Sequence, residues 1–322
     1  NRAPAGKDYG IRMRLFERRL VVVLGKGGVG RTTVTAALGL AAARRGRRAL
    51  VVEVSGQRRL SRLFGAEPQP DGTETPLLPG LTCLSISPQR VLEEYLVLTL
   101  KVRAVAERLA DSRAVGHLTA AAPGLRELVT LGKVWHLTEQ TLRDGSPRYD
   151  VVVVDAPATG HGIGLLRAPR QYAEIARVGR IGDEARAVDA LVTDRGRTGI
   201  VLVTLAEEIP VNETIDALGR LREVGLEADC AIANGLAAEL FSDADESAIR
   251  RLTDLGDTGA AAAGAARSQI TRRREQAGEL ARLRESLDIP LVELPLLSAP
   301  VLDTDAVSVL ADRLAAGLEE VG

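Results

Sequence analysis

A glycine-rich segment near the start of the chain is the part of the sequence best suited to chemistry, and it follows the apolar run 20–24. The segment consists of Gly25, Lys26, Gly27, Gly28, Val29, Gly30, Arg31, Thr32 and Thr33. Phosphate-binding loops have a glycine, four free positions, a second glycine, a lysine and then Ser or Thr. Glycines let the backbone curl so that its N–H groups face anionic oxygens, and the following helix directs its positive end at the same point. The spacing therefore predicts a loop that binds nucleotide phosphates.

The polar side chains of this loop indicate its chemistry. Arg31 stands at the lysine position and spreads the charge over a longer, planar group, so we expect weaker nucleotide binding and weaker transition-state stabilisation. Thr32 is expected to offer its hydroxyl to Mg²⁺, and Thr33 to contact the α-phosphate. Lys26 is one of few lysines in a chain whose basic residues are nearly all arginine. A lysine against this bias favours a specific role.

Short apolar runs alternate with helical stretches along most of the chain. The expected strands are residues 20–24, 49–54, 81–86, 149–154, 200–205, 230–233 and 290–294. Clear helical patterns fall at 32–43, 212–224 and 305–318. Runs that are apolar throughout indicate strands covered on both faces, and their alternation with helices predicts βα units in a parallel sheet. The fold class is therefore α/β, a doubly wound and mostly parallel sheet whose ligands bind at the carboxyl ends of the strands.

Two long intervals without strand signals suggest an inserted helical subdomain, at about 88–146 and 164–196. The first reads as helices 91–109 and 124–142, with an apolar stripe at helical spacing. These helices either pack on one another and on the sheet, or form a groove for an apolar client helix. We assign residues 1–19 to an N-terminal extension and 20–322 to a single domain. Residues 256–268 are rich in Ala and Gly and read as a loop or a loosely held helix, and Arg272 is expected to open a charged helix.

Composition excludes several classes of function. The net charge of −1 and the pI of about 6.4 give no electrostatic grip on nucleic acid or on an anionic membrane. The two cysteines, Cys83 and Cys230, form no Cys-x-x-Cys pair, which argues against a disulfide framework or a cysteine zinc site. No apolar run approaches the roughly 18–20 residues of a spanning helix. We expect a cytoplasmic protein with no membrane insertion and no nucleic-acid partner.

The loop sequence Lys-Gly-Gly-Val-Gly-x-Thr-Thr resembles the deviant phosphate loop of the family that contains septum-site and partition ATPases, nitrogenase iron protein and anion-pump ATPases. Later segments resemble the arsenical-pump ATPases and the targeting ATPases for tail-anchored membrane proteins. These segments are residues 155–161, 207–214, 234–236 and 293–297. The resemblance implies the phosphate-loop fold, ATP or ADP with Mg²⁺ as ligands, and a dimer.

The resemblance also implies roles for single residues. Lys26 would reach across the dimer interface to the phosphates bound by the other subunit, and Glu207 would also reach the opposite nucleotide. Asp155 ends the run 149–154 and would support Mg²⁺, while residues 157–161 would sense the γ-phosphate, although His161 also reads as a turn residue. Asn234 would bind adenine, and a loop from Pro295 to about residue 301 would cover the base.

One departure from the family pattern affects hydrolysis. After the run 49–54 the family places an aspartate that positions the attacking water, and Ser55 stands there in this chain. A serine cannot accept a proton as a carboxylate does, so hydrolysis should be slow. Glu53, two residues earlier on the same strand face, is an alternative carboxylate for this role.

These observations lead to a primary hypothesis and two alternatives. The primary one is an adenine-nucleotide-binding, anion-transporting-ATPase-like protein that works as a nucleotide-driven dimer switch. Its hydrolysis is weak, or it supports a paralogous ATPase subunit, and its client is hydrophobic or a small molecule. The first alternative is a nucleotide-gated binding scaffold that does not hydrolyse. The second is a membrane- or DNA-partitioning ATPase, against which the acidic segment 303–322 argues because that class needs a basic amphipathic C-terminal helix.

Overall fold

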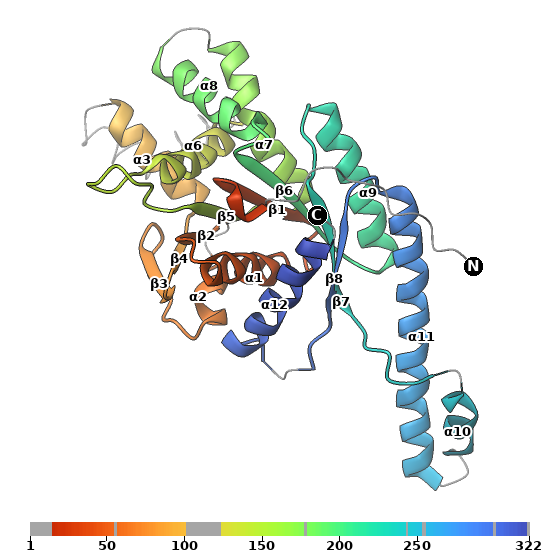
Figure 1. The fold of residues 1–322 in the computed structure, drawn as a ribbon. Coiled ribbons are helices and arrows are strands. Elements are labelled where there is room, and N and C mark those ends of the chain that lie inside the picture. The colour runs from red at the N-terminus through yellow and green to blue at the C-terminus, as the bar shows by residue number, and fades with distance from the viewer. Residues whose placement is uncertain are drawn as a thin grey trace.

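The computed structural model describes residues 15–54, 57–100, 124–176, 179–242, 244–252, 256–298 and 301–320. Its centre is an eight-stranded sheet in the order β3-β4-β2-β5-β1-β6-β7-β8 (Figure 1). The strands are β1 (Leu20–Gly25), β2 (Ala49–Glu53), β3 (Glu74–Leu78), β4 (Leu81–Ser85), β5 (Val151–Asp155), β6 (Thr198–Leu205), β7 (Cys230–Leu236) and β8 (Leu291–Pro295). All neighbouring pairs are parallel except β3–β4. The predicted doubly wound, mostly parallel α/β fold is confirmed.

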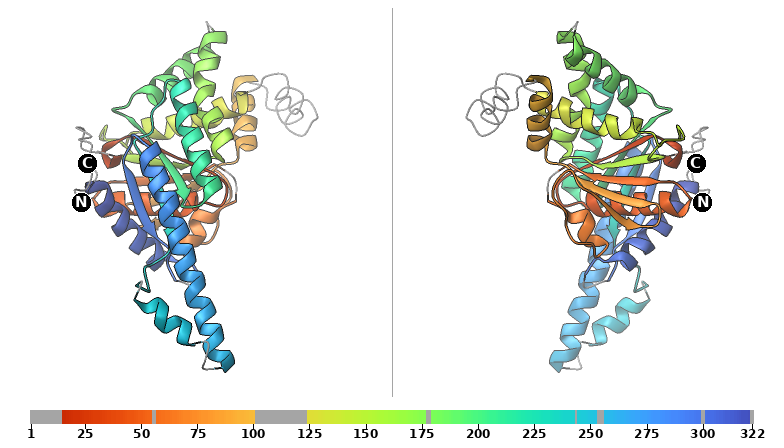
Figure 2. Two further views of the ribbon diagram at one scale, coloured as in Figure 1. Left: turned by 90° about the vertical axis from the view of Figure 1, so that its right-hand side faces the viewer. Right: turned by 90° about the vertical axis from the view of Figure 1, so that its left-hand side faces the viewer.

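Helices cover both faces of the sheet. They are α1 (Arg31–Arg44), α2 (Arg59–Leu63), α3 (Pro88–Leu100), α6 (Leu125–Glu139), α7 (Thr159–Ile175), α8 (Arg180–Thr193), α9 (Glu208–Glu223), α10 (Asp245–Leu252), α11 (Gly256–Ser286) and α12 (Thr304–Glu320), preceded by the 3-10 turn η1 (Leu15–Glu17). One core cluster joins alternate residues of the central strands to α1 and α12, and the other joins the remaining residues to α6, α7, α8 and α9. The two side views in Figure 2 show these layers on opposite sides of the sheet.

The central strands form because their residues are apolar on both faces. In β1 every residue is buried, and Val22 and Val23 belong to the two opposite core clusters. A strand covered on both sides has no reason to alternate apolar and polar residues. This burial fixes the carboxyl end of β1, and hence the glycine loop that follows it, beside the ends of β5 and β6.

The helices of the two long intervals pack together above one face of the sheet. Contacts join α3 to α6, α6 to α7, and α7 to α8 (Figure 1). Residues 101–123, which include the second half of the first expected helix, lie outside the described residues, as do residues 1–14 of the N-terminal extension.

The region after β7 differs from the sequence-based expectation. The Ala- and Gly-rich stretch 256–268 is the first part of α11, a helix of 31 residues, so Arg272 lies within this helix and does not open it. Alanine is the best helix former, which outweighs the scattered glycines here. In Figure 1, α11 extends away from the sheet and carries α10 at its far end. Ile249 of α10 packs with Ala263 and Ala266 of α11.

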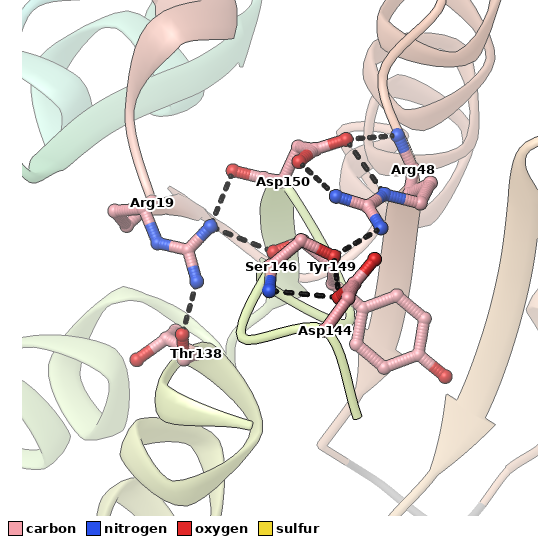
Figure 3. Close-up of polar contacts among 7 residues, drawn as sticks. All are labelled: Arg19, Arg48, Thr138, Asp144, Ser146, Tyr149 and Asp150. Atoms are coloured by element: carbon pink, nitrogen blue, oxygen red, sulfur yellow. Dashed lines mark hydrogen bonds and ion pairs between the residues drawn. The ribbon is translucent and has the colours of Figure 1, made fainter. Parts of the chain in front are cut away.

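An arginine–aspartate network fastens the amino ends of three strands (Figure 3). Arg48, just before β2, donates to Asp150, just before β5, at 3.1 and 2.9 Å. Arg19, just before β1, donates to the carbonyl oxygens of Tyr149 at 2.7 Å and of Thr138 in α6. Since these residues precede their strands, the network lies at the edge of the sheet opposite the glycine loop. It is a structural clamp that leaves the carboxyl edge free for ligands.

Candidate functional site: a glycine loop at the carboxyl edge of the sheet

The loop between β1 and α1 has the backbone that a phosphate-binding loop needs. Gly28 and Gly30 adopt φ values of 91° and 90°, which only glycine occupies without strain. A Cβ atom on Gly25 would lie 2.5 Å from the carbonyl oxygen of Val203 in β6. A Cβ on Gly30 would overlap the side-chain amide of Asn234. The glycines are therefore required by the close approach of β6 and β7 as well as by the curl of the loop.

Thr32 and Asp155 meet at the mouth of the loop. The Thr32 hydroxyl donates to Asp155 Oδ2 at 2.6 Å, which joins the start of α1 to the end of β5. Asp155 is 6% exposed, and burial raises the pKa of its carboxyl despite the Thr32 hydrogen bond and the nearby Arg31 charge. Its Oδ1 atom is buried and accepts no hydrogen bond from the residues that the structure describes.

This pair fits a magnesium ion. Mg²⁺ prefers oxygen ligands and takes one or two protein groups together with water and substrate phosphates. A hydroxyl, a carboxylate and a buried carboxylate oxygen with no hydrogen-bond donor supply that chemistry at the loop. Thr32 and Asp155 would hold the ion, which would supply charge neutralisation for phosphate oxygens.

Arg31 is turned toward β5. Its guanidinium donates to the carbonyl oxygen of Ala156 and lies 4.0 Å from Asp155 Oδ1. Burial lowers the pKa of Arg31, and the Asp155 charge opposes that effect. In this conformation the arginine connects the loop to the segment after β5, for which the family resemblance implies a γ-phosphate-sensing role. Thr33 follows in the first turn of α1 and is partly exposed.

The segment after β5 enters a helix at once. Pro157 precedes α7, which begins at Thr159, and the His161 side chain is exposed in its first turn. A Cβ on Gly162 would lie 2.6 Å from a Leu24 methyl group, so α7 packs closely on β1. This packing places the start of α7 beside the loop.

Glu53 lies directly opposite Asp155 in the β2–β5 register. Its Oε2 atom accepts the backbone N–H groups of Arg59 at 2.7 Å and Leu60 at 3.1 Å, so the carboxylate caps the N-terminus of α2. Glu53 is only 1% exposed. This capping role competes with the water-activating role considered for it. Ser55, the residue at the family's aspartate position, lies outside the described residues.

Lys26 makes an ion pair within its own chain. Its Nζ atom lies 2.7 Å from Glu213 Oε1 in α9, and both side chains are partly exposed. Glu207 is the exposed residue immediately before the same helix, at the carboxyl end of β6. Glu213 lies within the segment 207–214 that resembles the family, but no sequence pattern indicates its contact with Lys26. The two expected trans-acting residues therefore converge on one element.

Asn234 lies in β7, next to the loop. Its Nδ2 atom donates to the Val29 carbonyl oxygen at 2.9 Å. Pro295, at the end of β8, pairs with Leu236 of β7, and the next residue, Leu296, donates its N–H to the Leu236 carbonyl oxygen at 2.7 Å. These contacts place Asn234 against the loop backbone and Pro295 on the neighbouring strand.

Strand β1, the curled glycine loop and helix α1, whose Thr32 contacts Asp155 at the end of β5, define a phosphate-loop protein of the α/β class. A profile of the anion-transporting ATPase family matches residues 18–181. The chain belongs to this family.

Similar proteins align with most of the chain. ATPase BagA of Mycobacterium tuberculosis is 31% identical over 330 aligned positions, which cover 96% of this chain and 96% of that protein. A putative arsenical pump-driving ATPase of Halobacterium salinarum is 28% identical over 87% of this chain and 42% of its own length. ATPase GET3 of Kluyveromyces lactis is 25% identical over 71% of this chain and 74% of its own length. The resemblance to arsenical-pump and targeting ATPases is thus confirmed, and the family membership supports an ATPase that binds nucleotide.

Within the described part of the chain, no helix has both the length and the apolar character needed to cross a membrane.

Proposed function

We propose that this chain binds an adenine nucleotide with Mg²⁺ at the Gly25–Gly30 loop and acts as a nucleotide-driven dimer switch. The observation that carries the proposal is the 2.6 Å contact between the Thr32 hydroxyl and Asp155 at the mouth of the loop, with Asp155 Oδ1 buried and without a hydrogen-bond donor among the described residues. The Arg31 guanidinium lies 4.0 Å from Oδ1 and donates no hydrogen bond to it, so a cation bound directly to the carboxylate would still lower the cost of its burial. Family membership supports the nucleotide.

Each residue of the site then has a role. The backbone N–H groups of the loop and the start of α1 would bind the phosphates, and Thr33 would contact the α-phosphate. Thr32 and Asp155 would hold Mg²⁺. Asn234 would contact adenine, and Pro295 begins the loop expected to cover the base. Lys26 and Asp155 are the residues we assign to catalysis.

We expect hydrolysis at this chain's own site to be weak. The Arg31 guanidinium is engaged with Ala156 and Asp155, so it must leave these groups before it can neutralise charge on the outer phosphates. Glu53 is engaged with the N-terminus of α2, which leaves it poorly placed to activate water. Ser55 supplies no carboxylate. The same facts favour the alternative of a nucleotide-gated scaffold that never hydrolyses ATP. The scaffold and the weak ATPase would differ in ATP turnover but not in nucleotide binding.

The dimer is proposed from where Lys26 and Glu207 lie. Lys26 is partly exposed and Glu207 exposed, at the carboxyl edge of the sheet, so a partner docked on this edge would be within their reach. The partner is a second copy or a paralogous ATPase subunit. A paralogue with lysine at the position of Arg31 and aspartate at the position of Ser55 would gain one competent site from Lys26 and Glu207. We therefore favour hetero-association.

The client is proposed to be hydrophobic or a small molecule. A subdomain comprising the helices within about 88–146 and 164–196 would change shape as the dimer opens and closes. The exposed Ile175 at the end of α7 (76% exposed) adds apolar surface to this region. Cys83 and Cys230 are buried in separate strands, and burial raises the pKa of the Cys83 thiol to about 11. Since the thiolate is the metal-binding form, these cysteines do not favour a metalloid client.

Titration calorimetry with ATP and ADP, with and without Mg²⁺, tests the proposal. We expect binding in the micromolar range, on the order of −8 kcal/mol, and a loss of about tenfold or more when Mg²⁺ is omitted. Thr32→Val should abolish the Mg²⁺ effect because it removes the hydroxyl and keeps the branched shape. Thr35→Val is the matched control, since Thr35 lies one turn further along α1, buried and with its hydroxyl unpaired within the described structure. Absence of heat up to millimolar nucleotide, alone and with a paralogue, would overturn the proposal.

A further inference from the structure

The ion pair between Lys26 and Glu213 joins the glycine loop to α9 within one protomer. The Lys26 Nζ to Glu213 Oε1 distance is 2.7 Å, and the two side chains are 37% and 41% exposed. Lys26 is the loop residue proposed above to act on the partner's nucleotide. An ammonium group at this distance from a carboxylate already has a negative counter-charge inside its own chain.

The two members of the pair differ in freedom of movement. Glu213 lies in the second turn of α9, between the buried residues Val211 and Thr214, and the Thr214 hydroxyl donates to the Pro210 carbonyl oxygen at 2.8 Å. Arg282 of α11 fixes the start of the same helix by donating to Asn212 Oδ1 at 2.7 Å and to the Glu208 carbonyl oxygen at 3.2 Å. Glu213 is therefore presented from a well-anchored helix.

Lys26, in contrast, is followed by two glycines. A Cβ atom on Gly27 or Gly28 would meet no heavy atom within 4 Å, so open space surrounds this part of the loop. Glycine gives a backbone the widest choice of conformations. If the ion pair separates, we therefore expect Lys26 to move and Glu213 to stay in place.

From this geometry we infer that Glu213 is a positioning residue that retains Lys26 within its own protomer. When the dimer forms, Lys26 leaves the Glu213 carboxylate and contacts the phosphates of the partner's nucleotide instead. This inference rests on the proposed function, since it regulates the trans role of Lys26. The pair is partly solvated, and exposed ion pairs contribute little, so the exchange is easily reversed. Weak retention suits a switch, because nucleotide phosphates carry more charge than one carboxylate.

The first measurement asks whether Glu213 restrains Lys26 in the nucleotide-free chain. With so few lysines in the chain, the acylation rate of Lys26 by an amine-reactive reagent is readily followed by peptide mass spectrometry. Glu213→Gln keeps the size of the side chain and removes its charge, and it should raise the Lys26 rate about two- to fivefold at low salt. The gain should disappear at about 1 M salt, where the Debye length is near 3 Å. Asp216→Asn, the same charge change at an exposed position of α9, should leave the rate unchanged.

The second measurement asks whether this restraint opposes assembly. The self-association constant in MgATP, from sedimentation at several protein concentrations, should rise about two- to fivefold in Glu213→Gln and stay at the wild-type value in Asp216→Asn. An unchanged acylation rate, or an association constant that is unchanged or lower in Glu213→Gln, would overturn the inference. If Lys26→Ala leaves association untouched, the trans role itself fails, and the acylation result shows separately whether the ion pair restrains Lys26.

Discussion

The Asp155 carboxylate is subject to two opposing requirements, one for charge and one for burial. The proposed Mg²⁺ role requires a charged carboxylate, yet Asp155 is buried, and burial is the main cause of its raised pKa. A carboxyl whose pKa is higher in the folded chain binds protons more tightly there than in the unfolded chain, so its contribution to stability grows as the pH falls. At neutral pH the ionised form therefore lowers the free energy of unfolding.

Asp155→Asn should consequently stabilise the nucleotide-free protein at pH 7 by about 0.5–2 kcal/mol, as is common when a functional residue is neutralised. The variant keeps an acceptor for the Thr32 hydroxyl. Its advantage should shrink as the pH is lowered toward the raised pKa of Asp155, because the wild-type carboxyl then becomes neutral too. Urea unfolding at several pH values checks this, and a variant less stable than wild type at pH 7 would show that the Arg31 and Thr32 contacts outweigh burial.

Arg31 and Ser55 set the expected rate of hydrolysis. Restoring a carboxylate for water and a lysine for the phosphates in the double variant Ser55→Asp, Arg31→Lys should raise ATP turnover by roughly 10²–10⁴-fold, the range for a positioned acid or base. Arg31→Lys alone is the control and should gain less. A steady-state assay also separates the two proposals, because wild-type turnover above background supports a slow ATPase. A wild-type chain with no turnover, alone or with a paralogue, would support the scaffold.

At the scale of the element, β2 and α2 are connected by the Glu53 carboxylate. We expect Glu53→Gln to lower the free energy of unfolding by about 1 kcal/mol, since the cap loses its charge and one of its acceptor atoms becomes a donor. Hydrogen exchange should accelerate locally at Arg59 and Leu60, whose N–H groups this side chain accepts. Turnover per folded molecule should stay near wild type. A loss of 10²-fold or more would instead identify Glu53 as the base.

Most elements were predictable because their signal is local. The seven apolar runs are seven of the eight strands, with ends that agree to within three residues. The missed strand, β3, pairs antiparallel at the edge of the sheet and none of its residues is fully buried, so it lacks a continuous apolar run. The start of α11 was ambiguous because alanine and glycine favour opposite conformations. At the site, the loop motif assigned Thr32 to Mg²⁺ and the family resemblance assigned Asp155 to it, and the structure places these two side chains in contact. The contacts of Lys26 with Glu213 and of Asn234 with Val29 join distant parts of the chain and leave no local pattern.

At the scale of the whole molecule, the site lies at one edge of a rigid sheet. The Arg19, Arg48 and Asp150 network holds the opposite edge, so we expect the proposed nucleotide-driven movement to involve the loop, α9 and the helices above the sheet (Figure 3). Lys26, Glu207 and Glu213 all lie near the carboxyl edge, where they would link nucleotide binding to the proposed dimer. This arrangement predicts an assembly that depends on the nucleotide and not only on protein concentration.

Sedimentation velocity of wild type and Lys26→Ala, each alone and mixed with a paralogous subunit, in buffer, MgADP and MgATP, is the decisive test of the proposed dimer switch. We expect a dimer in MgATP that Lys26→Ala weakens by at least about tenfold, the cost of removing one charged contact to phosphate. The variant should keep its own nucleotide affinity by calorimetry. A Lys26→Ala chain that loses its own nucleotide binding, yet still forms the dimer and supports the partner's activity, would show that Lys26 does not act in trans.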